Sequence, residues 1–449
     1  MGIKVSKFGG SSVADGIQIH KIKDIIEADE ARRYIVVSAP GRRFESDVKI
    51  TDVLYLCHTH IQHHLPYEQL LQVIADRYYA MAVSLNSDIE KLKRELEEIR
   101  KTIEEGAGED YIASRGEYLN AILIADYLGY DFVDASGLIL FDSYGHLLTE
   151  ETNDQLAKEL GKHERAVIPG FYGTHKGTEQ IKTFSRGGSD ITGSLVARAV
   201  GAEVYENWTD VSGFLMADPK IVDNPKPIHS ISYKELRELS YMGASVLHED
   251  SIAPAKIANI PINIKNTNEP DNPGTLITGE EAILEGEDII TGVAGRKGFT
   301  VIALYKNMMS SDRGFVRRIL GILEDFGCNF EHIPSGIDTV SVVMSQKDMK
   351  GRRDKILDAF QKQLEPDGIE CFDNISLIAT VGHGMSRRKG VAARLFGALA
   401  EAGVNLRMIE QGSSEINIIC GVEDKDFEAA IRAIYRAFTI DAPAEEDRA

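Results

Sequence analysis

The chain has 449 residues, a formal net charge of −20 and a hydrophobic fraction of 43%. This length allows two or three domains of ordinary size, and the composition is typical of a folded globular protein. The negative charge argues against nucleic-acid or membrane-surface binding, although a local cluster of cations is still compatible with a phosphorylated ligand.

The sequence carries no sign of a disulfide framework, a zinc site or a membrane anchor. Its cysteines form no C-x-x-C pair; they are Cys57, Cys328, Cys371 and Cys420. No apolar run is long enough to span a bilayer, and the N-terminus has no apolar signal-peptide core. These features predict a cytoplasmic protein without nucleic-acid or membrane partners.

Strand and helix patterns alternate along the first part of the chain. Short apolar runs predict strands at 3–8, 34–39, 130–134, 166–169 and 202–208. Apolar residues spaced three and four apart predict helices at 17–26, 51–61, 87–105, 115–128 and 189–200. The alternation predicts a three-layer α/β sandwich with a mainly parallel sheet, whose ligands bind at the carboxyl ends of the strands.

The pattern changes after residues 266–279, which are rich in Pro, Gly and Asn. We therefore expect one domain at 1–285 and a second region at 286–449. Within the second region, strands are predicted at 299–305, 339–345, 376–382 and 416–422, and helices at 314–326, 352–364, 391–402 and 427–438. Segments 314–333 and 390–409 align without gaps, which predicts two α+β ferredoxin-like modules. The first covers about 305–370, and the second about 371–449 with an added strand from 286–304.

Three polar segments stand out in this part of the chain. KFGGSS at 7–12 and WTDVSGF at 208–214, with ADPK at 217–220, follow predicted strands, and SRGGSD at 185–190 leads into a predicted helix. Glycines before a helix let backbone N–H groups approach an anion, and a nearby Lys or Arg can neutralise a phosphoryl group or a carboxylate. The first segment lacks the spacing of a Walker P-loop. Each segment alone is equally compatible with a tight turn or a helix cap.

Together with YMGASVLH at 241–248, these segments in this order resemble the amino-acid-kinase superfamily, and within it the aspartate kinases. The C-terminal repeat resembles the paired ACT modules of those enzymes. The resemblance implies transfer of the γ-phosphoryl group of ATP to the side-chain carboxylate of L-aspartate. The products would be ADP and 4-phospho-L-aspartate, in the first step of lysine, threonine and methionine biosynthesis. It also implies ATP and Mg²⁺ as cofactors, with Mg²⁺ mainly on the phosphates and no metal site built from protein ligands.

The resemblance also implies roles for individual residues. Lys7 and Asp190 would be catalytic, with Asp190 orienting Lys7. The other expected ATP contacts are Gly9, Gly10, Ser11, Thr209, Asp210, Leu215 and Lys220. The residues expected to bind aspartate are Thr51, Glu117, Arg186 and Ser189. No strong base is needed, because the attacking carboxylate is already ionised. In one departure, Ser245 stands where some members of the family have a nucleotide-contacting Lys.

The ACT resemblance implies an effector site between two segments of the first module. The expected residues are Met308, Ser311, Asp312, Gly314, Phe315, Asp338, Thr339 and Val340. Lysine is the favoured effector, because Asp312 and Asp338 can pair with its ammonium groups, and threonine is the alternative. The modules also predict a homodimer, with a tetramer left open. A purely structural dimerisation module is the alternative to an effector site.

Two other functions are compatible with parts of the sequence. A kinase of the same superfamily could act on glutamate, acetylglutamate or a nucleoside monophosphate, but the ACT tail and the segment 115–117 argue against it. A catalytically silent amino-acid sensor would not need Lys7, Asp190 or Asp210. A histidine cluster at 58–64 could hold a metal, but an exposed polar helix end is the favoured interpretation.

Overall fold

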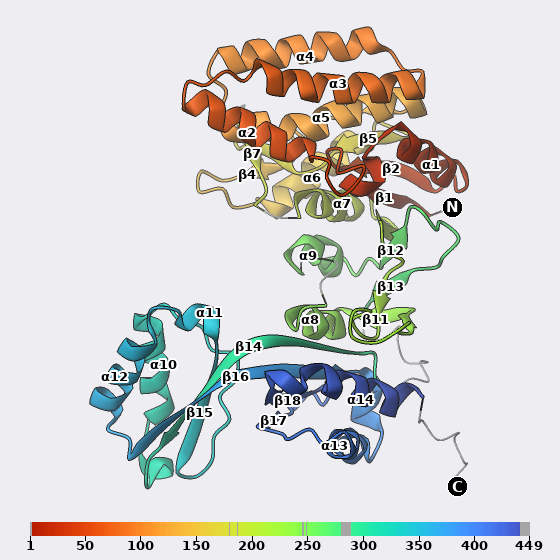
Figure 1. Ribbon diagram of the computed structural model, residues 1–449. Coiled ribbons are helices and arrows are strands. Elements are labelled where there is room, and N and C mark those ends of the chain that lie inside the picture. The colour runs from red at the N-terminus through yellow and green to blue at the C-terminus, as the bar shows by residue number, and fades with distance from the viewer. Residues whose placement is uncertain are drawn as a thin grey trace. The chain divides into compact units, whose positions relative to one another are not determined.

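The computed structural model describes residues 2–178, 180–185, 187–244, 247, 249–279 and 289–440. The chain forms two compact units (Figure 1). The first contains Met1–Phe214, Pro227–Tyr233 and Val246–Leu284, and the second contains Leu215–Lys226, Lys234–Ser245 and Glu285–Ala449. Among the described residues, no helix is both long enough and apolar enough to cross a membrane.

An eight-stranded sheet forms the centre of the first unit, in the order β11-β13-β12-β8-β1-β2-β5-β3. Neighbouring strands run parallel except β12 and β13, which are antiparallel. The strands are β1 (Lys4–Phe8), β2 (Arg32–Val37), β3 (Asp131–Phe132), β5 (Ala166–Pro169), β8 (Val204–Thr209), β11 (Ser230–Ser232), β12 (Ile262–Asn266) and β13 (Thr275–Thr278). Smaller strands are β4 (Leu140–Phe141), β6 (Tyr172–His175), β7 (Ile181–Thr183), β9 (Phe214–Leu215) and β10 (Pro227–Ile228).

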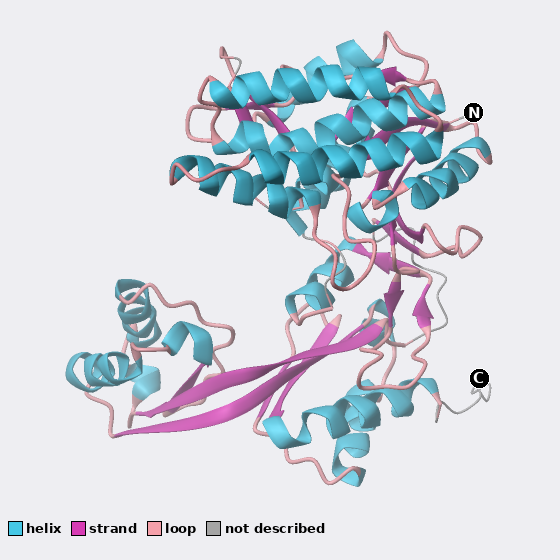
Figure 2. Ribbon diagram, turned by 45° about the horizontal axis from the view of Figure 1, so that its top comes forward, coloured by secondary structure: helices cyan, strands magenta, loops and turns pink. Residues whose placement is uncertain are grey.

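Helices cover both faces of this sheet. One face packs into a large apolar core with α1 (Gly16–Glu27), α2 (Ile50–Gln62), α3 (Glu68–Leu85), α4 (Ile89–Glu104) and α5 (Glu109–Leu128). The other face carries α7 (Gly188–Ala199), against which α6 (Thr149–Leu160) and α9 (Glu249–Ile257) pack. Figure 2 shows the helices lying over the strands of this unit. The predicted three-layer sandwich is confirmed.

The second unit is built on a five-stranded antiparallel sheet, in the order β15-β14-β16-β18-β17. Its strands are β14 (Gly292–Tyr305), β15 (Thr339–Ser345), β16 (Gly368–Val381), β17 (Met408–Glu410) and β18 (Asn417–Glu423). Its helices are most of α8 (Tyr233–Tyr241), α10 (Phe315–Asp325), α11 (Gln346–Met349), α12 (Arg353–Leu364), α13 (Val391–Glu401) and α14 (Phe427–Thr439). The predicted ferredoxin-like tandem is confirmed.

The long strands β14 and β16 run through both modules, and β14 begins seven residues before the predicted strand start. The segment GRKG at 295–298 hides this extension in the sequence, because it interrupts the apolar run. The β14–β16 ladder shifts register at the same place. A bulge of this kind lets a strand continue although its side-chain alternation is broken.

Candidate active site

A lysine, an aspartate and an asparagine meet at the carboxyl end of the central strands. Lys7 on β1 and Asn207 on β8 are cross-strand partners, so their side chains point to the same face of the sheet. The Lys7 Nζ lies 2.6 Å from Asp190 Oδ1, and the Asn207 Nδ2 donates to the same oxygen at 2.8 Å. Asp190 comes from the first turn of α7. This buried cation is therefore held in place by a carboxylate that is itself held by an amide.

The position of Asp190 depends on how α7 begins. Gly187 caps the helix in the left-handed conformation at φ +58°, which glycine adopts without strain. Gly170, just after β5, lets the first turn of α7 come close, because a Cβ there would lie 2.6 Å from the Cβ of Ser189. Ser189 is buried in this contact. The two glycines thus set the first turn of α7 against the ends of the strands.

The glycine turn after β1 forms the next part of the site. The Gly9 N–H donates to the Trp208 carbonyl at 3.0 Å, and Gly10 begins a short 3₁₀ turn, η1 (Gly10–Val13). The turn passes into α1, whose Asp15 side chain caps the helix by accepting from the Gln18 N–H. A Cβ at Gly9 would lie 3.5 Å from the Lys7 Nζ. The backbone of this turn, which we call the phosphate turn (Gly9–Ser12), therefore borders the lysine ammonium directly.

Glu117 on α5 is a buried carboxyl group whose partners are incomplete. Its side chain is 4% exposed, and its Oε2 has no hydrogen-bond partner among the described residues. Burial raises the pKa of the Glu117 carboxyl to about 8, although backbone N–H groups, that of Ala39 among them, oppose the shift. A buried carboxyl of this kind is suited to receive a cation from outside the protein.

Thr51 lies in the first turn of α2, and the start of α2 packs against α5 beside Glu117. A Cβ on Gly116 would lie 2.8 Å from the Cβ of Ala39 and 3.5 Å from the Cγ2 of Ile50. The end of β2, the start of α2 and the Glu117 turn of α5 are therefore adjacent. The structure thus brings Thr51 and Glu117 to the same edge of the sheet as the phosphate turn.

The other predicted nucleotide residues fall into different parts of the structure. Thr209 ends β8 in the first unit, where its hydroxyl donates to Asp210 at 3.1 Å. Leu215 and Lys220 belong to the second unit. Arg186 and Ser245 lie outside the described residues.

Asn207 contributes to the site although it belongs to none of the motifs recognised in the sequence. The signal was available, since Asn207 is a polar residue inside a buried strand (VYENWT), in register with Lys7. Its amide holds Asp190, and the Tyr205 hydroxyl donates to the Asp190 carbonyl at 3.1 Å. Recognising this would have required knowing that β1 and β8 are neighbours.

The predicted effector residues lie in the second unit, on two segments that are joined by hydrogen bonds. The Lys306 N–H donates to the Asp338 carbonyl at 2.9 Å, and the Ser310 N–H donates to the Ile337 carbonyl at 3.2 Å. Phe315 and Val340 are buried beneath these segments, whereas Met308 is 72% exposed. Asp312 pairs with Arg318 at 2.6 Å, which holds the pKa of Asp312 below its usual value. The side chain of Asp338 has no partner among the described residues.

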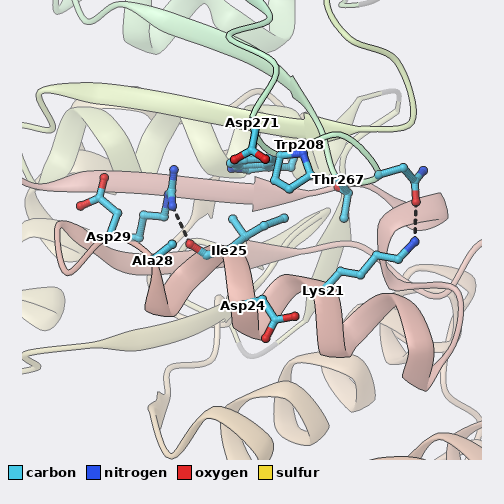
Figure 3. A pocket seen from close by; sticks show the side chains of 11 residues that line it. Lys21, Asp24, Ile25, Ala28, Asp29, Trp208, Thr267 and Asp271 are labelled. Carbon is cyan, nitrogen blue, oxygen red and sulfur yellow. Dashed lines mark hydrogen bonds between the residues drawn. The ribbon is translucent and has the colours of Figure 1, made fainter.

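A pocket of about 540 Å³ lies elsewhere in the first unit, between α1 and the segment that follows β12 (Figure 3). None of the predicted site residues lines it. Trp208 at its edge alternates with Asn207 along β8, so the pocket lies on the opposite face of the sheet from Asp190. Lys21 donates to Asn268, and Arg32 pairs with Glu206. Much of its polar lining is thus already paired.

The histidine cluster does not form a metal centre in the described part of the chain. His58 pairs with Glu109 at 3.1 Å, and His60 contacts the Pro66 carbonyl at 2.7 Å. No group of three or more His, Cys, Asp and Glu side chains among the described residues is arranged to hold a metal ion.

Known proteins match this chain over most of its length. The amino acid kinase family model matches residues 2–266, and an ACT domain model matches residues 378–438. Aspartokinase 3 of Bacillus subtilis is 37% identical over 97% of this chain and 98% of its own length. The solved aspartate kinase of Clostridium acetobutylicum is 51% identical, with a TM-score of 0.89, over 98% of this chain and 100% of its own.

Escherichia coli aspartokinase III, solved in complex with aspartate and ADP, is 25% identical with a TM-score of 0.71, over 97% of this chain and 99% of its own. These relatives match the chain from the phosphate turn through both modules of the second unit. The chain therefore belongs to the amino acid kinase family and, within it, to the aspartate kinases, which are phosphotransferases with a carboxyl group as acceptor.

Proposed function

We propose that the chain uses ATP to phosphorylate the side-chain carboxylate of L-aspartate, and that Glu117 recognises the substrate's ammonium group. The observation that carries this proposal is the unpartnered Oε2 of the buried Glu117. An incoming ammonium would supply the missing donor and favour the ionised form of the carboxyl group. The E. coli relative was solved with aspartate and ADP, which supports this substrate pair.

The remaining site residues are proposed to divide between the two substrates. Ser189 and Arg186 would bind the α-carboxylate of aspartate together with Thr51. The phosphate turn, Thr209, Asp210, Leu215 and Lys220 would bind ATP. Under this proposal residues 1–285 are catalytic and 286–449 are regulatory.

The chemistry follows from the charges at the site. A side-chain oxygen of aspartate attacks the γ-phosphorus, an O–P bond forms, the bond to the β-phosphate oxygen breaks, and ADP leaves. Lys7, oriented by Asp190 at 2.6 Å, would neutralise charge on the transferring group. Mg²⁺ would enter with the phosphates of ATP and neutralise charge there. No proton has to be removed from the nucleophile.

The test is ADP release by the purified protein with Mg²⁺ and ATP, offered L-aspartate, L-glutamate, N-acetylglutamate, UMP or N-acetyl-L-aspartate. We expect release with L-aspartate alone. N-acetyl-L-aspartate is the sharpest comparison, because it keeps both carboxylates and lacks the ammonium group. Equal rates with both aspartates would refute the role of Glu117 while leaving the reaction intact. Release only with another acceptor would refute the substrate.

We further propose that lysine inhibits the enzyme by binding to the first ACT module, with threonine as the alternative effector. Asp338 has an unpartnered carboxylate on the exposed segment there. In the second module, by contrast, Asn417 begins β18 in the same way that Thr339 begins β15 in the first module. The Asn417 Nδ2 donates to the Glu238 carboxylate of α8 at 2.6 Å. The nearby His383 N–H donates to Glu235 at 2.9 Å. The E. coli relative solved with lysine and aspartate supports lysine.

Activity measured with saturating lysine, threonine or methionine tests this regulation, and Asp338→Asn should lose the response to lysine. No change with any of the three would refute it. The same proposal includes a homodimer formed through the ACT modules, a role in the first step of lysine, threonine and methionine biosynthesis, and a cytoplasmic location. Light scattering that shows a monomer with and without effector would contradict the dimer.

A further inference from the structure

The segment that joins β2 to α2 lies directly against the phosphate turn. We call this segment the β2–α2 strap (residues 40–49). At its start, the Gly41 N–H donates to the Gly10 carbonyl at 2.8 Å, and a Cβ on Gly41 would lie only 2.7 Å from the Gly10 carbonyl carbon. At its end, the Ile50 N–H closes back onto the Pro40 carbonyl at 3.2 Å, just before Thr51. The strap therefore spans from the proposed ATP side to the proposed aspartate side.

A buried arginine from another helix holds this strap together. Arg77 lies on α3 and is 6% exposed. Its Nη1 donates to the carbonyls of Ala14 at 3.2 Å and Gly41 at 3.3 Å, and its Nη2 donates to the Val48 carbonyl at 3.4 Å. The Ala14 carbonyl lies just after the phosphate turn, and the Gly41 and Val48 carbonyls lie near the two ends of the strap. One planar guanidinium thus binds three backbone carbonyls on two segments at once, which the single ammonium of a lysine could not do in the same geometry.

The Asp47 carboxylate supplies the negative charge that offsets the cost of burying the Arg77 guanidinium. Its Oδ2 accepts from the Arg77 Nη2 at 2.8 Å. On its exposed side the same carboxylate accepts from the Arg43 Nε at 2.8 Å and Nη2 at 3.0 Å. The Arg43 side chain, its backbone N–H and the Arg77 charge hold the pKa of Asp47 far below its usual range. The Asp47 carboxylate is therefore ionised near neutral pH, where it can pair with both arginines.

We infer that Arg77 is a positioning residue for phosphoryl transfer: it sets the spacing between the phosphate turn and the first turn of α2. This inference rests on the proposed function, because those two elements are the ones assigned to ATP and to aspartate. In-line attack requires the carboxylate oxygen and the γ-phosphorus at near-contact distance, and a misplacement of about 1 Å can lower the rate about 100-fold. Loss of Arg77 should therefore lower kcat more than it raises either KM.

The experiment compares Arg77→Lys and Arg77→Met with a matched control, Arg43→Met. Both arginines pair with Asp47, but the hydrogen bonds to the carbonyls of Ala14, Gly41 and Val48 come from Arg77. We expect kcat of Arg77→Lys to fall about 10-fold or more, Arg77→Met to fall further, and Arg43→Met to stay within about twofold of wild type. Thermal unfolding monitored by circular dichroism shows which variants are folded.

The inference is overturned if folded Arg77→Lys keeps a kcat within about twofold of wild type, or if Arg43→Met loses as much as Arg77→Lys. If neither Arg77 variant folds, Asp47→Asn decides the question, because it removes the charge that holds the buried guanidinium against the three carbonyls. A several-fold loss of kcat at unchanged fold supports the inference, and unchanged kcat refutes it. The wild-type assay with aspartate judges the proposed function separately. Mg·ADP affinity of the same variants reports on the phosphate turn even if aspartate is not the acceptor.

Discussion

The two carboxylates of the proposed active site, Asp190 and Glu117, are held in opposite ways. Asp190 already has its partners, because Lys7 and Asn207 both reach its Oδ1 within 2.8 Å. Glu117 is more deeply buried, yet its Oε2 has no partner among the described residues, and burial raises its pKa to about 8. The first carboxylate thus has its partners within the protein, whereas under the proposed function the substrate would supply the missing partner of the second.

This difference corresponds to two different roles, stabilisation of the transition state and recognition of the substrate. A group that must stabilise charge in the transition state gains from being fixed beforehand, because no reorganisation is then needed during the reaction. A group that recognises a substrate can remain incomplete, because the substrate repays the cost of its burial. The paired site should therefore control kcat, and the unpaired one should control the KM for aspartate.

The largest effect is expected on the paired side, for Lys7→Ala. This substitution removes the cation that borders the phosphate turn and leaves the Asp190 carboxylate without its ion-pair partner. We expect kcat to fall about 1,000-fold or more, with a much smaller change in the KM for aspartate. Steady-state ADP release with both substrates varied measures the two constants. A variant that keeps its kcat and loses only affinity would reverse the assignment of roles.

Glu117→Gln should show the opposite pattern, with a larger change in the KM for aspartate than in kcat. The amide keeps the shape of the side chain but cannot form an ion pair with the substrate ammonium. We expect the KM for aspartate to rise about 30-fold, or about 2 kcal/mol, with the KM for ATP nearly unchanged. The matched control is N-acetyl-L-aspartate, whose poor use should not become worse in the variant. A selective loss of kcat would instead place Glu117 in the chemical step.

Asn207→Leu tests whether the paired side depends on its full set of partners. Asp190 would keep Lys7 but lose the amide that fixes its orientation, so the Lys7 ammonium would be less well placed. We expect kcat to fall about 10-fold, less than for Lys7→Ala, with the protein still folded. The kcat of the double variant with Lys7→Ala provides the check: if Asn207 acts through Lys7, the two losses should not add.

Much of this architecture could be predicted from local pattern. The strands β1, β5 and β15 and the helix α13 lie within two residues of their predicted bounds, because apolar periodicity and flanking glycines define them. The partners of the site residues could not be predicted in the same way. Asn207 and Arg77 contribute through strand order and helix packing, which a linear pattern does not contain. The contrast between Asp190 and Glu117 depends on burial and on unmet hydrogen bonds, which exist only in the folded chain.

The smallest expected effect is the pH dependence of aspartate binding, and it follows from the raised pKa of Glu117. In the folded protein without substrate, this carboxyl holds its proton up to about pH 8, whereas in the unfolded chain it releases the proton near pH 4.5. The contribution of this group to the free energy of unfolding is therefore lost as the pH rises between these values. Aspartate binding should expel that proton. We expect its affinity to increase about fivefold from pH 7 to pH 8 and then to level off.

Calorimetric titration in two buffers of different ionisation enthalpy measures this coupling directly, since most of one proton should be released per site at pH 7. Glu117→Gln is the control and should show neither proton release nor this rise in affinity. The same variant should gain stability relative to wild type as the pH increases toward 8, because its amide has no proton to release on unfolding. Proton release that persists in the variant would assign the titration to another group and remove the distinction between the two carboxylates.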